Sequence, residues 1–148
     1  MSNSIEKKDL LGLLIPKLWL EGYHIIYRKF GKYLQAPPPV GEYEIDLVAK
    51  KGNSFAIALC LSANEIDNPA LIEKIRFLAS RRSRFNKQPI QLFIGIDTNN
   101  YFRLARLLQM LDNDEKKSIK SFALSSVPAA NLFQNTHEGT HTPAPYYV

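Results

Sequence analysis

The sequence predicts one α/β domain in which helices flank a mixed central sheet. Short apolar segments rich in β-branched and aromatic residues alternate with longer segments whose apolar residues recur every three or four positions. Three predicted strands precede the second helix, so the first strands should form a meander and the later ones should follow helical crossovers. The 148 residues are enough for one domain with a substantial core.

The first predicted elements are a helix and a strand. Residues 4–20 have an apolar face at helical spacing, although Pro16 removes a backbone donor and should kink or split the helix. Gly22 suits the end of this helix. Residues 23–30 (YHIIYRKF) are typical of a strand. The triple proline at 37–39 cannot donate to a sheet, which favours a stiff connector over an SH3 ligand.

The next stretch predicts a β-hairpin. Its arms are residues 42–51 and 54–62, and Gly52-Asn53 forms a two-residue turn. Alternation along the first arm predicts one face with Tyr43, Ile45, Leu47 and Ala49, and an opposite face with Glu44, Asp46, Val48 and Lys50. The second arm is almost wholly apolar, which is typical of a central strand covered on both faces.

The second half predicts alternating helices and strands. Asn68 and Pro69 should begin a helix that runs to about Arg84. The remaining expected elements are a loop at 64–67, a strand at 90–96, a helix at 101–111, a charged loop at 112–117 and a strand at 119–125. The order is therefore α-β-β-β-α-β-α-β. Residues 1–127 should form the domain, and residues 128–148 an extended or disordered tail.

Composition restricts the class of protein. The net charge of +5 permits a polyanionic partner without requiring one. A single cysteine, Cys60, excludes an internal disulfide framework, suits a reducing compartment, and is expected to be a small core residue. No apolar run is long enough to cross a bilayer, and the N-terminus lacks the layout of a signal peptide. We therefore expect a cytoplasmic protein without a membrane partner.

The element order and the first arm of the hairpin resemble the PD-(D/E)xK fold, also called the restriction-endonuclease-like fold. Within it, the chain is most similar to the YraN-like proteins related to Holliday-junction resolvases. The resemblance spans roughly Lys8 to Leu124. Its residues are Glu21-Gly22-Tyr23-His24-Ile25-Ile26, Arg28, Glu44-Ile45-Asp46-Leu47-Val48-Ala49 and Gly52. It implies that Asp46 binds a divalent metal and that an E-x-K pair on the next strand completes a nuclease site.

Such a site has a clear chemical basis. Carboxylates hold a hard cation that polarises the phosphate and activates water, and a lysine stabilises the developing negative charge. The second arm of the hairpin departs from this pattern. With Gly52-Asn53 as the whole turn, Leu59 lies opposite Asp46 and Leu61 lies opposite Glu44. A turn one residue longer would bring a cysteine and a serine there instead, so the standard catalytic site is predicted to be absent.

The missing groups have possible substitutes elsewhere in the chain. Glu44 and Asp46 would then bind Mg²⁺, but only if the protein is active; otherwise they are vestigial. Candidates for migrated groups are Lys50, Glu73 and Lys74, with Glu6, Glu65 and Asp67 as further carboxylates. Solvated charges on helix and loop surfaces are the simpler interpretation of these residues.

A basic cluster at the end of the second long helix is the other candidate site. Its residues are Arg76, Arg81, Arg82, Arg84 and Lys87, with Lys29, Lys32, Lys50 and Lys51 as possible additions. Such a cluster is suited to the phosphate backbone of a nucleic acid. Basic residues at the C-terminus of a helix also complement the helix dipole, which is the alternative explanation.

These features predict a catalytically inactive nuclease-like domain, or pseudoenzyme, that needs no cofactor. It would bind DNA or another nucleic acid, or serve as a scaffold in a protein assembly. One alternative is a Mg²⁺-dependent DNA endonuclease with migrated active-site residues. The other is a purely structural subunit that binds a protein partner or forms a homodimer.

Overall fold

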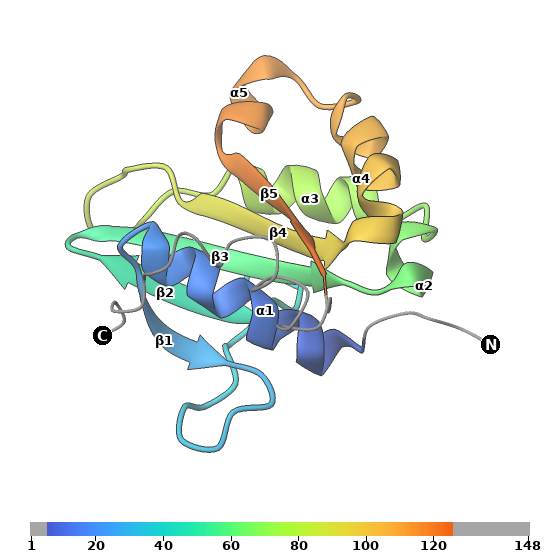
Figure 1. Cartoon of the computed structure of the whole chain (residues 1–148). Coiled ribbons are helices and arrows are strands. Elements are labelled where there is room, and N and C mark those ends of the chain that lie inside the picture. The colour runs from blue at the N-terminus through green and yellow to red at the C-terminus, as the bar shows by residue number, and fades with distance from the viewer. Residues whose placement is uncertain (1–5, 126–148) are drawn as a thin grey trace, which may run out of the picture.

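A computed structural model describes residues 6–125 and has a five-stranded mixed sheet flanked by helices (Figure 1). The strands are β1 (His24–Arg28), β2 (Leu47–Lys51), β3 (Ser54–Leu61), β4 (Gln91–Asp97) and β5 (Ile119–Leu124). The helices are α1 (Lys7–Leu20), α2 (Ala63–Ile66), α3 (Leu71–Ala79), α4 (Tyr101–Leu108) and α5 (Asn113–Lys117), with a 3₁₀ turn η1 (Thr98–Asn100) before α4. The predicted tail at 128–148 lies outside the described residues.

The strands lie in the spatial order β1-β2-β3-β4-β5. The pairs β1–β2 and β2–β3 are antiparallel, whereas β3–β4 and β4–β5 are parallel. The predicted meander and mixed sheet are therefore confirmed. The hairpin register is confirmed from Leu47 to Lys51, because Lys51 pairs with Ser54 and Leu47 pairs with Ala58. The predicted pairings of Asp46 with Leu59 and of Glu44 with Leu61 are not part of this ladder.

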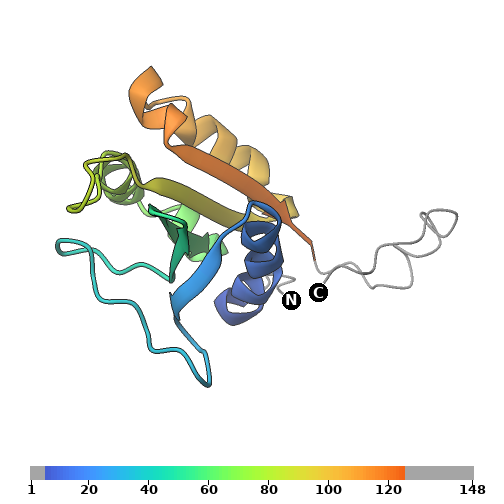
Figure 2. The same ribbon diagram turned by 90° about the vertical axis from the view of Figure 1, so that its left-hand side faces the viewer.

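Helices cover both faces of the sheet. Figure 1 shows α1 across the front, with α3 and α4 behind, and Figure 2 has α1 and α3 on opposite sides. Alternate residues of β3 serve the two cores: Ala56, Ala58 and Cys60 pack with α1, whereas Ile57, Leu59 and Leu61 pack with α3. The small side chains under α1 allow close approach of the helix. Gly95 of β4 contributes to this, since an added Cβ there would lie 3.4 Å from Leu14 of α1, and 2.7 Å from Leu124 of β5.

Several helix boundaries differ from the prediction. Helix α1 is one continuous helix that includes Pro16, so the predicted split is wrong. Helix α3 ends at Ala79 instead of about Arg84, because the chain then turns back and the N–H of Ile90 donates to the carbonyl of Arg81. The basic residues after Ala79 therefore belong to a loop.

Two predicted loops are short helices. The segment at 64–67 overlaps α2 (Ala63–Ile66), where the Ser62 hydroxyl accepts from the Glu65 N–H and the Glu65 carboxylate accepts from the Ser62 N–H. Helix α5 begins with the same reciprocal cap between Asp112 and Glu115. Both pairs have the three-residue spacing of a capping box, a signal that the sequence carries.

The first arm of the hairpin is shorter than predicted, because β2 begins at Leu47. The N–H of Asp46 donates to the carbonyl of Ala58, the residue that also pairs with Leu47. This irregularity reverses the alternation of side chains. Ile45 belongs to the core under α3, whereas Leu47 belongs to the core under α1. The prediction that these two residues share a face is therefore wrong.

Within 6–125, no helix is long and apolar enough to span a membrane.

Candidate functional site

The first candidate site is centred on Asp46, whose residue surface is only 1% exposed. Its Oδ2 accepts a hydrogen bond from the backbone N–H of Cys60 at 2.8 Å. The Nζ of Lys7, in the first turn of α1, lies 3.5 Å from the same oxygen. The Nζ of Lys29, just after β1, lies 3.6 Å from Oδ1. Both carboxylate oxygens therefore face ammonium groups.

Each of these lysines also contacts an outer carboxylate. Lys7 Nζ lies 2.9 Å from Oε2 of Glu65 in α2, and Lys29 Nζ lies 2.9 Å from Oε1 of Glu44. The inner Asp46 is thus linked to two other carboxylates through lysines. We call these five residues the Asp46 cluster.

The pKa values in the cluster reflect this pairing. Burial lowers the pKa of Lys7, but the Asp46 and Glu65 charges outweigh it and leave the pKa above the ordinary 10.5. Burial raises the pKa of Glu65, but hydrogen bonds from Ser62 and Lys7 outweigh it and leave the pKa below 4.5. The hydrogen bond from Lys29 likewise lowers the pKa of Glu44. The carboxylates and ammonium groups therefore favour one another's charged forms.

A divalent cation fits this donor set poorly. Mg²⁺ needs several oxygen ligands around one point. Here the inner carboxylate is occupied by two ammonium groups and an N–H, and lysines separate it from the outer carboxylates. Among residues 6–125, no group of three or more His, Cys, Asp or Glu side chains could hold a metal ion.

The three candidates for migrated groups lie at different places. Lys74 of α3 interacts electrostatically with the cluster. Burial lowers the pKa of Lys74 most, the positive charge of Lys7 lowers it further, and the negative charge of Asp46 raises it. Glu73 is instead paired with Arg76 at 3.0 Å. Lys50 lies near the other end of β2, where its Nζ is 5.4 Å from the centre of the Phe55 ring.

Cys60 contributes its backbone to the cluster, whereas its thiol is buried. Burial raises the pKa of the Cys60 thiol well above its ordinary value of 9.0, and the Asp46 charge raises it further. The thiol is therefore protonated at neutral pH and unsuited to act as a nucleophile. This agrees with its predicted place in the core.

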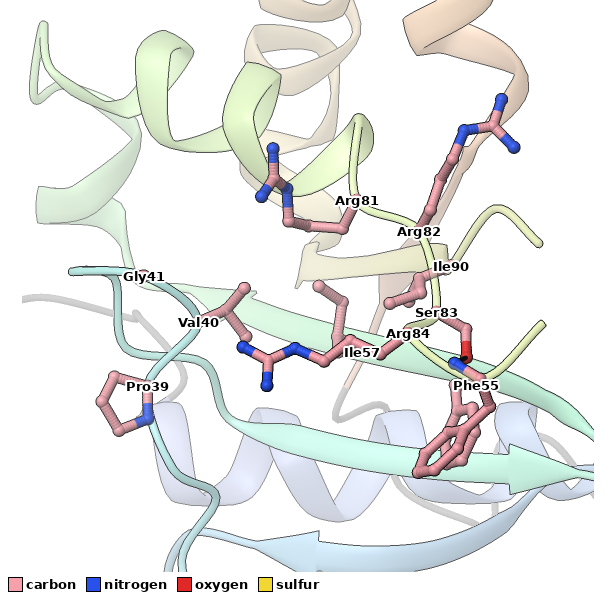
Figure 3. A pocket seen from close by; sticks show the side chains of 11 residues that line it. Pro39, Val40, Gly41, Phe55, Ile57, Arg81, Arg82, Ser83, Arg84 and Ile90 are labelled. Carbon is pink, nitrogen blue, oxygen red and sulfur yellow. Dashed lines mark hydrogen bonds between the residues drawn. The ribbon is translucent and has the colours of Figure 1, made fainter. Parts of the chain in front are cut away.

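The second candidate site is a cavity of about 370 Å³ at the end of α3, which we call the arginine cavity. It lies between the 39–41 segment, β3 and the loop that joins α3 to β4 (Figure 3). In Figure 3 the side chain of Arg84 extends across the cavity toward Val40, whereas the guanidinium group of Arg82 points away from it. The complete lining is Pro39, Val40, Gly41, Phe55, Ile57, Arg81, Arg82, Ser83, Arg84, Phe85 and Ile90.

Two of these arginines have fixed positions. The guanidinium carbon of Arg81 lies 4.0 Å from the centre of the Phe77 ring, and its Nε donates to the carbonyl of Phe77 at 3.2 Å. Arg82 donates from Nη1 to the carbonyl of Lys87 at 2.9 Å. The lining of the cavity includes no acidic residue, so its electrostatic character is positive.

The loop that carries the arginines is held together by its own hydrogen bonds. The N–H of Ser83 donates to the carbonyl of Gln88 at 2.9 Å, and Lys87 donates back to Ser83 at 3.0 Å. The side-chain amide of Asn86 donates to the carbonyl of Asn53, in the hairpin turn, at 3.0 Å. The loop is therefore anchored to the sheet.

The predicted basic set is only partly gathered in one place. Arg81, Arg82 and Arg84 line the arginine cavity, and Lys87 lies in the same loop. Arg76 lies elsewhere: it pairs with Glu73 and, at 3.4 Å, with Glu115 of α5. It therefore fastens α5 to α3.

Sequence reasoning missed two features of these sites. Lys7 was not among the candidates, and no local pattern connects it to Asp46, 39 positions later. The pairing of Phe55 with Phe85, whose rings stack with centroids 6.2 Å apart, also joins distant segments. A phenylalanine between arginine and asparagine in a polar loop was the one available signal for it.

No family model, curated protein or solved structure that we compared with this chain matches it.

Proposed function

We propose that this chain is a nuclease-like domain that binds nucleic acid through the arginine cavity and does not hydrolyse it. The observation that carries the proposal is the set of three arginines around one cavity whose lining has no acidic residue. Guanidinium groups bind phosphate oxygens with two parallel hydrogen bonds, which makes arginine well suited to a phosphate backbone.

The Asp46 cluster supports the view that the domain lacks catalysis. The ammonium groups of Lys7 and Lys29 supply the positive charge that a metal would otherwise provide to the buried carboxylate of Asp46. A buried carboxylate must be paired, and here lysines meet that need. On this proposal Asp46 holds α1, β1 and β3 together and has no contact with substrate.

The kinship with restriction-endonuclease-like proteins remains part of the proposal. Its support is the α-β-β-β start, the parallel strands that follow, and an aspartate immediately before β2. A shared fold does not fix activity, so the function rests on the residues of the two sites.

Fluorescence anisotropy with labelled oligonucleotides tests the proposal. Phosphate contacts from these arginines predict that the logarithm of the association constant falls as the logarithm of salt concentration rises, by roughly 0.7 per contact for a single strand. The double variant Arg81→Ala/Arg84→Ala should weaken binding uniformly across sequences and flatten this slope by about 1.4.

A charge-matched control separates the cavity from general electrostatics. The double variant Lys17→Ala/Arg106→Ala also removes two positive charges, from exposed positions on α1 and α4. It should retain most of the affinity. Equal losses in the two double variants would overturn the assignment to the arginine cavity, and absence of salt-sensitive binding would overturn nucleic-acid binding altogether in favour of a protein partner.

The second candidate function is a Mg²⁺-dependent nuclease. One observation favours it: Lys7 contacts Asp46 and Glu65 together, so a single side chain stands between two carboxylates. A cleavage assay with Mg²⁺ or Mn²⁺ on single-stranded, duplex and branched DNA distinguishes the candidates. Cleavage that Asp46→Asn abolishes would establish the nuclease and contradict the inactive domain.

A further inference from the structure

The side chain of Phe85 is 87% exposed, although it lies in a loop that is otherwise well ordered by hydrogen bonds. Its ring stacks on Phe55 of β3, with the ring planes 26° apart. The N–H of Phe85 donates to the hydroxyl of the buried Ser83 at 3.1 Å, and the next residue, Asn86, is tied to the hairpin turn. The exposed ring is therefore held in place.

The stacked phenylalanines are shared by two cavities. One is the arginine cavity, and the other is a cavity of about 410 Å³, which we call the Lys50 cavity. Phe55 and Phe85 line both, and the rest of the second lining is Lys50, Asn53 and Asn86. No acidic residue lines either cavity. The two phenylalanine rings therefore adjoin basic residues in both cavities.

This order of groups matches the chemistry of an unpaired nucleotide segment. Each nucleotide has a flat base and a negatively charged phosphate, so stacking and charge pairing alternate along the chain. In a duplex the faces of the bases are covered by their neighbours, so an aromatic ring can stack only on a base that has been unstacked. A fixed, exposed ring beside cations therefore discriminates in favour of single strands.

We propose that Phe55 and Phe85 form a stacking platform for a base of single-stranded nucleic acid, with the flanking phosphates held by the arginine cavity and by Lys50. This inference rests on the proposed function and narrows it from nucleic acid in general to unpaired strands. The sugar is not specified by these contacts, so DNA and RNA share the required chemistry.

The test uses the full chain and three labelled probes of about 15 nucleotides: single-stranded DNA, RNA of the same sequence, and the DNA duplex. Binding is followed by fluorescence anisotropy. We expect tighter binding to at least one single strand than to the duplex. Phe85→Ala should weaken binding of that strand about tenfold, because stacking of one base contributes on this scale.

Two further variants keep the result interpretable. Phe85→Trp retains a stacking surface and should retain the affinity. Phe102→Ala removes a phenylalanine that is 58% exposed on α4, and should leave the affinity unchanged. Unfolding midpoints equal to that of the wild type would show that each variant is folded, as expected for side chains so exposed.

The outcomes separate the two proposals. If the duplex binds as tightly as the single strands, or if Phe85→Ala binds within about twofold of the wild type while Arg84→Ala weakens binding, the stacking platform is wrong and backbone binding stands. If the wild type binds none of the probes, both proposals fail.

Discussion

The carboxylate of Asp46 accepts a hydrogen bond from the backbone N–H of Cys60, and the two atoms lie 2.8 Å apart. This contact joins the bend before β2 to the C-terminal end of the core strand β3, and Lys7 and Lys29 complete the surroundings of the carboxylate. A structural role for Asp46 has consequences for stability that a catalytic role would not require.

Asp46→Ala should destabilise the fold by about 3 kcal/mol, because it leaves a buried N–H without its acceptor and removes the buried carboxylate that faces two partly buried ammonium groups. Asp46→Asn should cost less, since its amide oxygen can still accept from Cys60. Urea unfolding measures both. Glu44→Gln, at an exposed position in the same cluster, is the control and should hardly move the midpoint. An Asp46→Ala protein as stable as the wild type would contradict the structural role.

Glu65→Gln tests the electrostatics of the cluster through pH. Because the folded state lowers the pKa of Glu65, its ionised form contributes stability above the ordinary pKa of 4.5, and this is lost as pH falls through the folded pKa. The stability difference between the wild type and Glu65→Gln should therefore be constant above about pH 6 and shrink below 4.5. Urea midpoints across this range measure it. A difference that grows on acidification would have the wrong sign.

Arg76→Ala should lower the stability of the fold without lowering its affinity for nucleic acid. Its guanidinium links Glu73 of α3 to Glu115 of α5, so the variant should lose about 1 kcal/mol of stability, as expected for a partly exposed pair. Its affinity for nucleic acid should stay within about twofold of the wild type, since the side chain lies away from the arginine cavity. A large loss of affinity in a folded Arg76→Ala protein would extend the binding surface along α3.

The thiol of Cys60 should be unreactive in the folded protein. It is buried and its pKa is raised, so neither access nor thiolate formation favours its modification. A thiol-specific reagent at about pH 8 should react rapidly only after addition of denaturant. Rapid reaction under native conditions would indicate that β3 opens readily at this point.

The sequence predicts those features whose signals lie in neighbouring residues, and it does not predict those that depend on contacts between distant residues. The hairpin register followed from the two-residue turn at Gly52-Asn53, and the apolar run of β3 indicated a strand buried on both faces. The capping boxes of α2 and α5 are local signals too, and each marks the start of a short helix. The irregular backbone at Asp46 was not predictable, because the contacts that accompany it, with Ala58 and Cys60, are made to residues distant in the chain.

The same reasoning explains the sites. A run of arginines predicted a basic surface, and three of its members do line one cavity. The sequence could not separate Arg76 from them, because its partner Glu115 lies on an element distant in the chain. Nor could it bring Phe85 onto Phe55, which depends on how the loop is anchored to the hairpin turn.

The most direct test of a binding domain without catalysis is one titration of labelled single-stranded oligonucleotide, performed in Mg²⁺ and in EDTA, with the strand length checked afterwards. We expect binding in EDTA that is at least as tight as in Mg²⁺ and weakens with salt, and an intact strand in both buffers, because the arginine cavity needs no metal and Mg²⁺ competes for the phosphates. Binding that requires Mg²⁺, or shortening of the strand that Asp46→Asn prevents, would contradict the central claim.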